Sequence, residues 1–332
     1  MMNRKTQAAG VLSVRAMLGL LVAAAFGLRL MIRLPRGESS FLENGYTFYL
    51  GLSTTFLRGG GFCSAPGEGC ASRMPVYPLL ISPFLSSGWI YPGLVVLQAA
   101  IGTAMVWVAW KLGLELFNAR TGLLAAGMTA FSPYAVVHDT ALQETVLVNA
   151  FLALGVALLI WASRVSSGRL FAAGGATLAL AVLTSARIGF VLPIAIAWTT
   201  LCAGRSWKRR VRDAVLVALP IAVLVGGWMV RNWSLTGAPV LTTEAGSNLW
   251  FANSPWTFSH FPRGSIDRSS VEAIEHLTAQ QVTALETAGS NEIAVSRLWA
   301  TWAFEYVKTH PIETMQRALE KEPQVAITRN LV

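Results

Sequence analysis

Charged residues are scarce in this chain, and their scarcity limits what kind of protein it is. Only 13% of the 332 residues are Asp, Glu, Lys or Arg, whereas 54% are apolar. Soluble domains carry about a quarter charged residues, so this composition excludes an ordinary cytosolic enzyme and a disordered tail. Three cysteines are too few for a disulfide-dense secreted module. The composition therefore predicts an integral membrane protein.

The motifs of common soluble enzymes are also missing. The sequence contains no GxxxxGK(S/T) phosphate loop, and the glycines at 59–61 lack the following lysine, which argues against an ATP-driven pump. The four histidines are scattered without HExxH spacing, so we expect no metal site and no cofactor. The aspartates are Asp139, Asp213 and Asp267, and no Asp-x-Asp pair can hold a metal-bound nucleotide sugar. A sugar donor, if there is one, is expected not to be a nucleotide.

What the chain does contain is a series of long apolar runs. A membrane-spanning helix needs roughly 20 mostly apolar residues. Seven stretches approach that length: 14–34, 92–116, 121–137, 142–162, 170–186, 188–203 and 214–230. They predict an all-α polytopic membrane protein with about seven transmembrane helices, a large first periplasmic loop and an extracytoplasmic C-terminal segment.

The first stretch has a second interpretation, because a basic start followed by the alanines at 23–25 also resembles a signal peptide. Hydrophobicity resumes at Leu28, which favours a span. Arg29 and Arg33 lie toward its outer end, where their long side chains are expected to reach the membrane interface.

The net charge of +9 is explained by orientation rather than by a nucleic-acid partner. With the N-terminus inside, the segments on that side carry twelve basic residues against two acids, Glu115 and Asp213, and the other fifteen acids fall on the opposite side. Lys and Arg are enriched in cytoplasmic loops in this way. We therefore predict a protein of the inner (cytoplasmic) membrane, with its N-terminus inside, its C-terminus outside and no nucleic-acid partner.

Two polar regions remain, and both fall on the extracytoplasmic side. The first, 35–91, includes a Tyr-rich amphipathic stretch at 43–56, and loops of that length are usually functional. It also holds Cys63 and Cys70, which are disulfide candidates in an oxidising compartment, with two unpaired thiols as the alternative. Cys202 ends a predicted span near the cytoplasm.

The second polar region follows the last predicted span. The expected domains are therefore a transmembrane module at 1–230 and an extracytoplasmic tail at 231–332. Within the tail, 291–309 predicts a helix that lies along the membrane surface. Its expected apolar side consists of Ile293, Val295, Leu298, Trp299, Trp302 and Phe304.

Charged side chains gather near the predicted outer membrane boundary. They are Glu38, Glu43, Glu144, Arg187 and Arg231, which come from four separate segments. A charged side chain at membrane depth is costly and usually faces a cavity or marks a functional path. These groups therefore predict one extracytoplasmic pocket, and solvation of each side chain by lipid headgroups is the alternative.

Short motifs along the chain occur in the order found in one enzyme family. They are 43–46, 59–62, 74–79, Ser132-Pro133 followed by Glu144, Leu183-Thr184 followed by Arg187, 227–232, 237–240, 246–249 and His310-Pro311. Through these motifs, residues 40–315 resemble the GT-C membrane glycosyltransferases, the protein-mannosyltransferase and aminoarabinose-transferase-like group that uses polyprenyl-phosphate sugars.

The resemblance implies transfer of a sugar, with inversion, from a polyprenyl-phosphate donor in the lipid membrane to an acceptor hydroxyl on a glycan, lipid or protein. Glu43 is the implied general base, but the family usually has aspartate there, so Glu38 is the alternative. Arg187 and Arg231 are implied to hold the donor phosphate, because guanidinium groups bind phosphate oxygens in pairs. The implied pocket residues are Tyr46, Arg73, Tyr77, Asp139 and Glu144.

Members of this family continue with several more spans, whereas this chain stops at Val332. A short variant, a truncated product and a need for a membrane-protein partner are the alternatives, and we expect the chain alone to be weakly active or inactive as a transferase. The competing function is a lipid or glycolipid flippase subunit without chemistry. A flippase explains the spans and the buried charges but not the carboxylates of the first outer loop.

Overall fold

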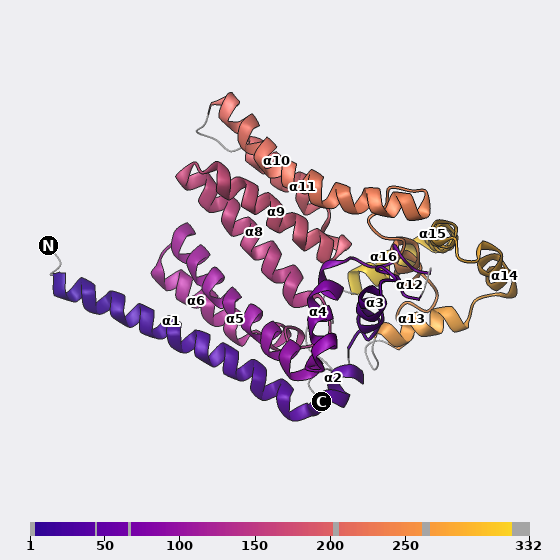
Figure 1. Cartoon of the computed structure of the whole chain (residues 1–332), viewed down its shortest axis with the longest axis horizontal. Helices are drawn as coiled ribbons and strands as arrows, with labels where there is room; N and C mark the ends of the chain where they lie inside the picture. Colours follow the sequence, from indigo (N-terminus) through magenta and orange to yellow (C-terminus); the bar gives the residue numbers. More distant parts are fainter. Residues whose placement is uncertain (1–3, 44, 66–67, 202–205, 261–265, 321–332) are drawn as a thin grey trace. The chain divides into compact units, whose positions relative to one another are not determined.

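The structure is a computed structural model that describes residues 4–43, 45–65, 68–201, 206–260 and 266–320 (Figure 1). Within these ranges the regular secondary structure consists of helices, together with an isolated β-bridge between Ala65 and Glu68. The all-α class expected from the sequence is therefore confirmed for the part of the chain that is described.

The chain divides into two compact units. The N-terminal unit comprises Met1–Thr54 and Met74–Gly227, and the C-terminal unit comprises Thr55–Arg73 and Trp228–Val332. The sequence predicted a boundary after residue 230. The structure differs from that division because it assigns the cysteine-bearing part of the first polar region to the C-terminal unit.

The N-terminal unit is built from helices that follow one another closely along the chain. Its α-helices are α1 (Arg4–Arg33), α2 (Gly37–Glu43), α3 (Phe48–Leu57), α4 (Val76–Ser87), α5 (Ile90–Leu116), α6 (Ala119–Phe131), α7 (Pro133–His138), α8 (Thr145–Val165), α9 (Gly168–Thr184), α10 (Val191–Leu201) and α11 (Trp207–Thr236). The 3₁₀ turns η1 (Leu34–Arg36) and η2 (Ala186–Ile188) lie between them. The ends of α3 and α11 extend into residues of the C-terminal unit.

Each of the seven apolar stretches contains a helix, but the helices differ in length. Among the described residues, four segments are long and apolar enough to cross a membrane: Val14–Glu43, Ile90–Leu116, Thr145–Val165 and Trp207–Thr236. The other stretches correspond to α6 with α7, to α9 and to α10, and the last two have 17 and 11 residues. At 1.5 Å per residue, α10 is about 16 Å long, roughly half the hydrocarbon thickness. The seven-span layout stays a prediction.

The stretch expected at 121–137 is interrupted at Ser132-Pro133, between α6 and α7. Proline disfavours the helical conformation of the residue before it, and Ser132 is accordingly extended, with φ −60° and ψ 116°. The Ser132 hydroxyl accepts a hydrogen bond from the amide of Ala135 and caps α7. Local chemistry therefore explains why this stretch is two helices.

Two helix hairpins form much of the N-terminal unit. Figure 1 shows α5 beside α6 and α8 beside α9. Glycines allow α5 and α6 to approach closely, because a Cβ atom on Gly113 would lie 2.7 Å from Gly122 Cα. Asn118 stabilises the start of α6, since its side chain accepts hydrogen bonds from the amides of Arg120 and Thr121. Small residues at such contacts are typical of helices packed in membranes.

The first polar region consists largely of short helices packed on the rest of the unit. Helices α2, α3 and α4 bury Phe41, Tyr49 and Tyr77 in an apolar cluster with residues of α5 and α8. The amphipathic stretch expected at 43–56 is divided, because α2 ends at Glu43 and α3 begins at Phe48. In the described residues, the region predicted as a large first periplasmic loop thus contains packed helices.

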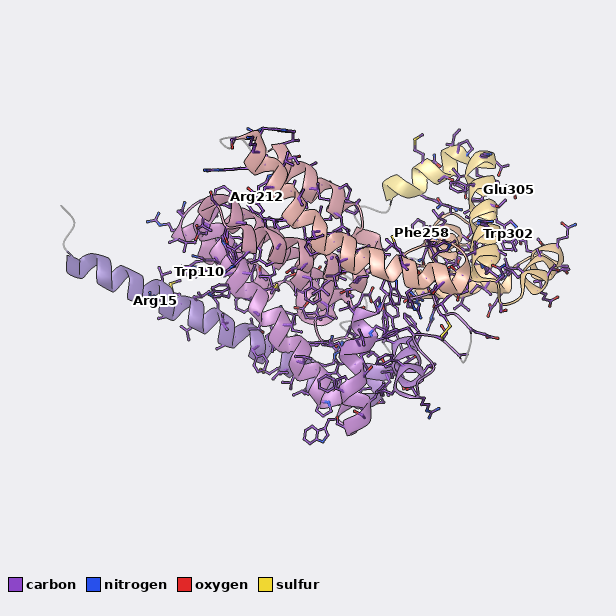
Figure 2. The ribbon with its side chains drawn as sticks, turned by 45° about the horizontal axis from the view of Figure 1, so that its top comes forward. Arg15, Trp110, Arg212, Phe258, Trp302 and Glu305 are labelled. Carbon is purple, nitrogen blue, oxygen red and sulfur yellow. A yellow bond between two sulfur atoms is a disulfide. The ribbon has the colours of Figure 1, made fainter. Side chains whose placement is uncertain are left out.

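Several basic residues lie toward one end of the N-terminal unit. Figure 2 shows Arg15 on α1 and Arg212 on α11 toward the same end. Near the end of α8, Arg164 forms an ion pair of 2.8 Å with Glu115 of α5. This is the end that the charge distribution assigns to the cytoplasm.

The C-terminal unit packs around aromatic side chains. Its helices are α12 (Ala245–Ala252), α13 (Ile266–Glu275), α14 (Ala279–Ala288), α15 (Glu292–Thr309) and α16 (Pro311–Glu320). The ring of Trp250 on α12 lies 6.3 Å from that of Trp299 and 6.2 Å from that of Trp302, both on α15. These rings form the core that joins α12 to α15.

Helix α15 confirms the helix expected at 291–309 and corrects the face assigned to it. Trp299 is buried, and Val295 and Trp302 pack in the same cluster. Phe304 lies about 140° further around the helix and is 57% exposed. Phe304 therefore does not share the side of Trp299, and placement of α15 on the membrane surface stays a prediction.

Candidate functional site

Residues 139–144, which we call the 139–144 loop, join α7 to α8 and are held by polar side chains from several helices. Gln98 of α5 is fully buried, and its Nε2 donates to the carbonyl oxygens of Asp139 at 3.1 Å and Ala141 at 2.7 Å. Gln98 Oε1 accepts from the hydroxyl of Tyr77 on α4 at 3.0 Å. A single buried amide, fully hydrogen-bonded as buried polar groups usually are, therefore ties α4 and α5 to the loop.

Two arginines of α1 hold the loop from another helix. Arg29 Nε and Nη2 donate to Asp139 Oδ2 at 2.9 and 2.7 Å, and Nη1 donates to the carbonyl oxygen of Ala25 at 3.1 Å. Arg33 Nε donates to Thr140 Oγ1 at 3.4 Å. The expectation that both side chains reach the membrane interface is wrong, because the two arginines are 0% and 4% exposed. Both guanidinium groups instead donate hydrogen bonds to residues inside the N-terminal unit.

The loop ends at Glu144, which pairs with a residue between α9 and α10. Glu144 Oε1 accepts from Arg187 Nη2 at 2.9 Å, and Arg187 Nε donates to Ser185 Oγ at 3.0 Å. The side chain of Glu144 is 10% exposed, whereas that of Arg187 is 74% exposed. Glu144 Oε2 is buried and has no hydrogen-bond donor among the described residues. The pair thus combines an accessible guanidinium with a carboxylate oxygen that lacks a partner.

Tyr77 and Tyr46 contact the same region in different ways. Tyr77 is fully buried, and burial, with the nearby charge of Glu144 adding to it, raises the pKa of its phenol well above the ordinary value. Tyr77 therefore stays neutral and donates its hydrogen bond from within the core. The amide of Tyr46 donates to the carbonyl oxygen of Leu142 at 2.9 Å, while the residue is 39% exposed.

Both candidate bases belong to α2. Glu38 is in its first turn and Glu43 is its last residue, and both are exposed. Gly45 packs against the 139–144 loop, since a Cβ atom there would lie 2.5 Å from Leu142 Cβ. Glu43 is therefore the candidate closer along the chain to this contact. Asn44, part of the family-like motif, lies outside the described residues.

Arg231 and Arg73 lie in the C-terminal unit, and both have protein partners there. Arg231 Nη1 donates to the carbonyl oxygen of Cys70, and the guanidinium carbon lies 4.6 Å from the centre of the Trp228 ring. Arg73 forms an ion pair with Glu244. These contacts give both arginines a structural role within the C-terminal unit.

Glu292, which sequence reasoning missed, holds the cysteine-bearing segment in place. A disulfide joins Cys63 and Cys70. The Glu292 carboxylate accepts hydrogen bonds from the amide of Cys70 at 2.7 Å and from the hydroxyl of Thr243 at 2.6 Å. Its position in the first turn of α15, where acidic side chains are favoured, is the signal that the sequence carries. Cys202 lies outside the described residues.

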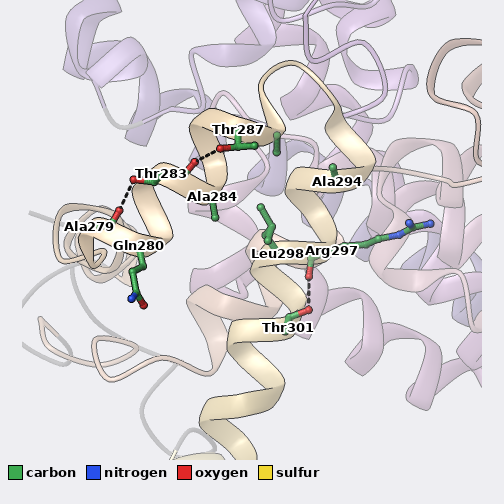
Figure 3. A pocket seen from close by; sticks show the side chains of 10 residues that line it. Ala279, Gln280, Thr283, Ala284, Thr287, Ala294, Arg297, Leu298 and Thr301 are labelled. Carbon is green, nitrogen blue, oxygen red and sulfur yellow. Dashed lines mark hydrogen bonds between the residues drawn. The ribbon is translucent and has the colours of Figure 1, made fainter.

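The C-terminal unit also contains a groove of about 840 Å³ between α14 and α15 (Figure 3). The hydroxyls of Thr283, Thr287 and Thr301 donate to carbonyl oxygens of their own helices at 2.9, 2.7 and 2.9 Å. Figure 3 shows Leu298 pointing toward α14 and Arg297 extending to the other side. The groove is mainly apolar and does not supply the charged groups that sugar-phosphate chemistry requires.

A comparison of sequences matches part of the chain to a known family. Residues 75–228 match the family model for dolichyl-phosphate-mannose-protein mannosyltransferase. The match confirms the resemblance to the GT-C glycosyltransferases. A comparison with curated proteins gives no match. Together, the family match and the apolar helices support a multi-pass membrane glycosyltransferase of the GT-C type.

The residues that match the family model include Glu144 and Arg187. Glu38, Glu43 and Arg231 lie outside the matched residues, so their assignment rests on the short motifs of the sequence. In the portions that the structure describes, no group of three or more His, Cys, Asp or Glu side chains is arranged to hold a metal ion.

Proposed function

We propose that the protein transfers a sugar from a polyprenyl-phosphate donor to an acceptor hydroxyl, with inversion, at the extracytoplasmic face of the inner membrane. The observation that carries this proposal is the Glu144–Arg187 pair, an exposed guanidinium beside a buried carboxylate oxygen that lacks a donor. A lipid-linked sugar phosphate fits both features, because its phosphate is anionic and its sugar is rich in hydroxyl donors.

Arg187 is the first candidate for the donor phosphate. A guanidinium group presents paired N–H donors to phosphate oxygens. Glu144 and Ser185 fix the orientation of the side chain, while its 74% exposure leaves the remaining N–H groups accessible. A fixed positive charge beside the phosphate stabilises the lipid phosphate as it leaves. Arg231 is the second candidate.

Glu43 is the proposed general base, with Glu38 as the alternative. The carboxylate takes the proton of the acceptor hydroxyl as the hydroxyl oxygen attacks the anomeric carbon of the sugar. The bond from that carbon to the phosphate oxygen breaks, and its electron pair leaves with the lipid phosphate. Attack from the side opposite the leaving group inverts the configuration of the anomeric carbon.

Glu144 has two proposed tasks, one for each carboxylate oxygen. Oε1 orients Arg187 through their hydrogen bond. Oε2 accepts a hydrogen bond from a hydroxyl of the donor sugar, which supplies the donor that this buried oxygen lacks. A buried acceptor without a partner costs free energy, so binding of a hydroxyl there is favourable.

Transfer is tested by incubating the purified protein with a radiolabelled polyprenyl-phosphate sugar and a membrane extract that supplies the acceptor. We expect radioactivity to move from the lipid to the acceptor, with the opposite anomeric configuration in the product. Glu144→Gln is expected to lower this transfer, whereas Arg169→Lys, at an exposed position in the first turn of α9, is the matched control and is expected to leave it unchanged. Sugar that crosses a vesicle membrane but stays on its lipid would show a flippase instead.

A further inference from the structure

A fully buried ion pair supports the 139–144 loop on the side of α1. Arg29 and Asp139 are 0% and 4% exposed, and both hydrogen bonds of the pair reach the same carboxylate oxygen. Buried ion pairs contribute little net stability, because removing two charges from water offsets most of their attraction. Packing alone therefore does not explain why a charged pair occupies this place among apolar helices.

The ion pair is connected to the candidate site through one short segment. Asp139 begins the loop whose last residue, Glu144, binds Arg187. The backbone between them is held as well, because Gln98 binds the carbonyl oxygen of Asp139 and the amide of Tyr46 binds that of Leu142. A shift of Asp139 is therefore transmitted along a few residues to Glu144.

The neighbouring helix α5 has a glycine, Gly102, where it passes the ion pair. A Cβ atom on Gly102 would overlap the carboxylate of Asp139 and would lie 2.9 Å from Arg29 Nε. Gly102 is in the interior of α5, where glycine is less favourable than alanine for the helix. The absence of a side chain at this position gives the ion pair its space.

We propose that Arg29 and Asp139 are positioning residues, which fix the 139–144 loop so that Glu144 holds Arg187 in the geometry used for sugar transfer. This inference rests on the proposed function. Neither residue contacts the sugar donor in this proposal, and both act through Glu144. Small displacements of a group that orients a substrate lower turnover strongly, since about 1 Å can cost a hundredfold in rate.

The test replaces both charges with apolar side chains, in the double variant Arg29→Met/Asp139→Leu. Such replacements often preserve stability, so we expect thermal unfolding in detergent to stay near that of the wild type. We expect kcat for transfer to fall at least about tenfold, with the KM for the donor changed less than about twofold. A folded double variant with the kcat of the wild type would overturn the proposal.

A matched control removes an ion pair that does not support the loop. Arg164→Met/Glu115→Leu eliminates the pair between α8 and α5, where the two side chains are 44% and 27% exposed, and is expected to retain the wild-type kcat. If the Arg29/Asp139 double variant does not fold, Arg29→Lys replaces it, because lysine keeps the charge but cannot make both bonds to Asp139. An unchanged kcat in a folded Arg29→Lys protein would also overturn the proposal.

Hydrogen exchange separates this inference from the proposed function. In the double variant, we expect peptides covering 139–148 to exchange at least about tenfold faster than in the wild type, while the same peptides in the control variant stay unchanged. If the wild-type protein has no transferase activity but the double variant still shows this faster exchange, the proposed function is rejected and the support of the loop by the ion pair is kept. Unchanged exchange at 139–148 would reject that role even in an active enzyme.

Discussion

One substitution distinguishes the effect of the positive charge of Arg187 from the effect of its donor geometry. Arg187→Lys keeps the positive charge but loses the fork of donors that binds Glu144 and that is proposed to bind the donor phosphate. We expect the KM for the lipid-linked sugar to rise about tenfold, as for the loss of one charge-assisted hydrogen bond, with unfolding unchanged because the side chain is 74% exposed. Donor saturation equal to that of the wild type would remove the phosphate role.

Glu43 offers a test of the proton acceptor. Glu43→Gln keeps the size of the side chain but cannot take a proton, so transfer is expected to fall by about 10²–10⁴ with donor binding retained. Glu43 is exposed at the end of α2, and the protein should fold normally. Steady-state rates with labelled donor measure the effect.

Glu38→Gln is the control for Glu43, because both residues are exposed on the same short helix. A loss of transfer in Glu38→Gln alone would move the base to Glu38, and two active variants would argue against the proposed mechanism. Glu43→Asp restores the residue that the resembled family usually has. Retained activity in this variant would support one catalytic position that accepts either acid.

The sequence indicates the candidate site through charged and polar residues that occur within or beside apolar stretches. Glu144 and Arg187 are recognisable because they are charged at the ends of apolar runs. Arg29 and Gln98 carry the same signal, as polar residues inside apolar stretches, but their partners lie 110 and 41 residues away along the chain. Only the packing of α1 and α5 on the 139–144 loop shows what these side chains bind.

At the scale of helices, Gly102 tests the contact of α5 with α1 and the loop. Gly102→Ala forces a methyl group into the Asp139 carboxylate, and overpacking of this kind typically costs about 1–3 kcal/mol. We expect a lower unfolding midpoint for this variant in detergent. Gly27→Ala on α1 is the control, because a Cβ atom there meets nothing within 4 Å. Equal midpoints for the two variants would contradict the packing at Gly102.

Helices with long apolar runs were predictable, and short packed helices were not. Four segments including α5 and α8 carry enough apolar length to be recognised from composition alone. Helices α2, α3 and α4 form in a polar region and are stabilised by burying Phe41, Tyr49 and Tyr77 among residues from other helices. These tertiary contacts cannot be read from the local sequence, whose signal in this region was the amphipathic stretch at 43–56.

For the whole molecule, one contact within the C-terminal unit constrains the membrane topology. The amide of Cys70 binds the carboxylate of Glu292, so both residues must lie on the same side of a membrane. The chain therefore crosses an even number of times between them. Of the four long candidate spans, three fall in this interval, whereas six of the seven apolar stretches do. The contact supports the seven-span proposal over four spans.

Reporter fusions distinguish these two topologies. With seven spans, a reporter that fluoresces only in the cytoplasm is expected to be bright when fused after Ser167, between α8 and α9, and dark when fused after Thr309, at the end of α15. With only the four long helices crossing, the pattern reverses at both positions. Fluorescence after Thr309 with none after Ser167 would therefore reject seven spans.

The disulfide provides an independent measure of sidedness for the whole chain. Disulfides persist in the oxidising compartment outside the inner membrane and are rare in the cytoplasm, and the Cys63–Cys70 bridge belongs to the same unit as α15. In spheroplasts, we expect a membrane-impermeant maleimide to label these cysteines only after reduction. Cys63→Ser/Cys70→Ser is expected to lower the stability of the C-terminal unit by up to about 3 kcal/mol, since the bridge restricts the unfolded chain. Glu292 still holds the amide of Cys70 in that variant, so the loss should be partial. Labelling of both cysteines without reductant would contradict the bridge, and labelling only after the membrane is permeabilised would place the C-terminal unit in the cytoplasm.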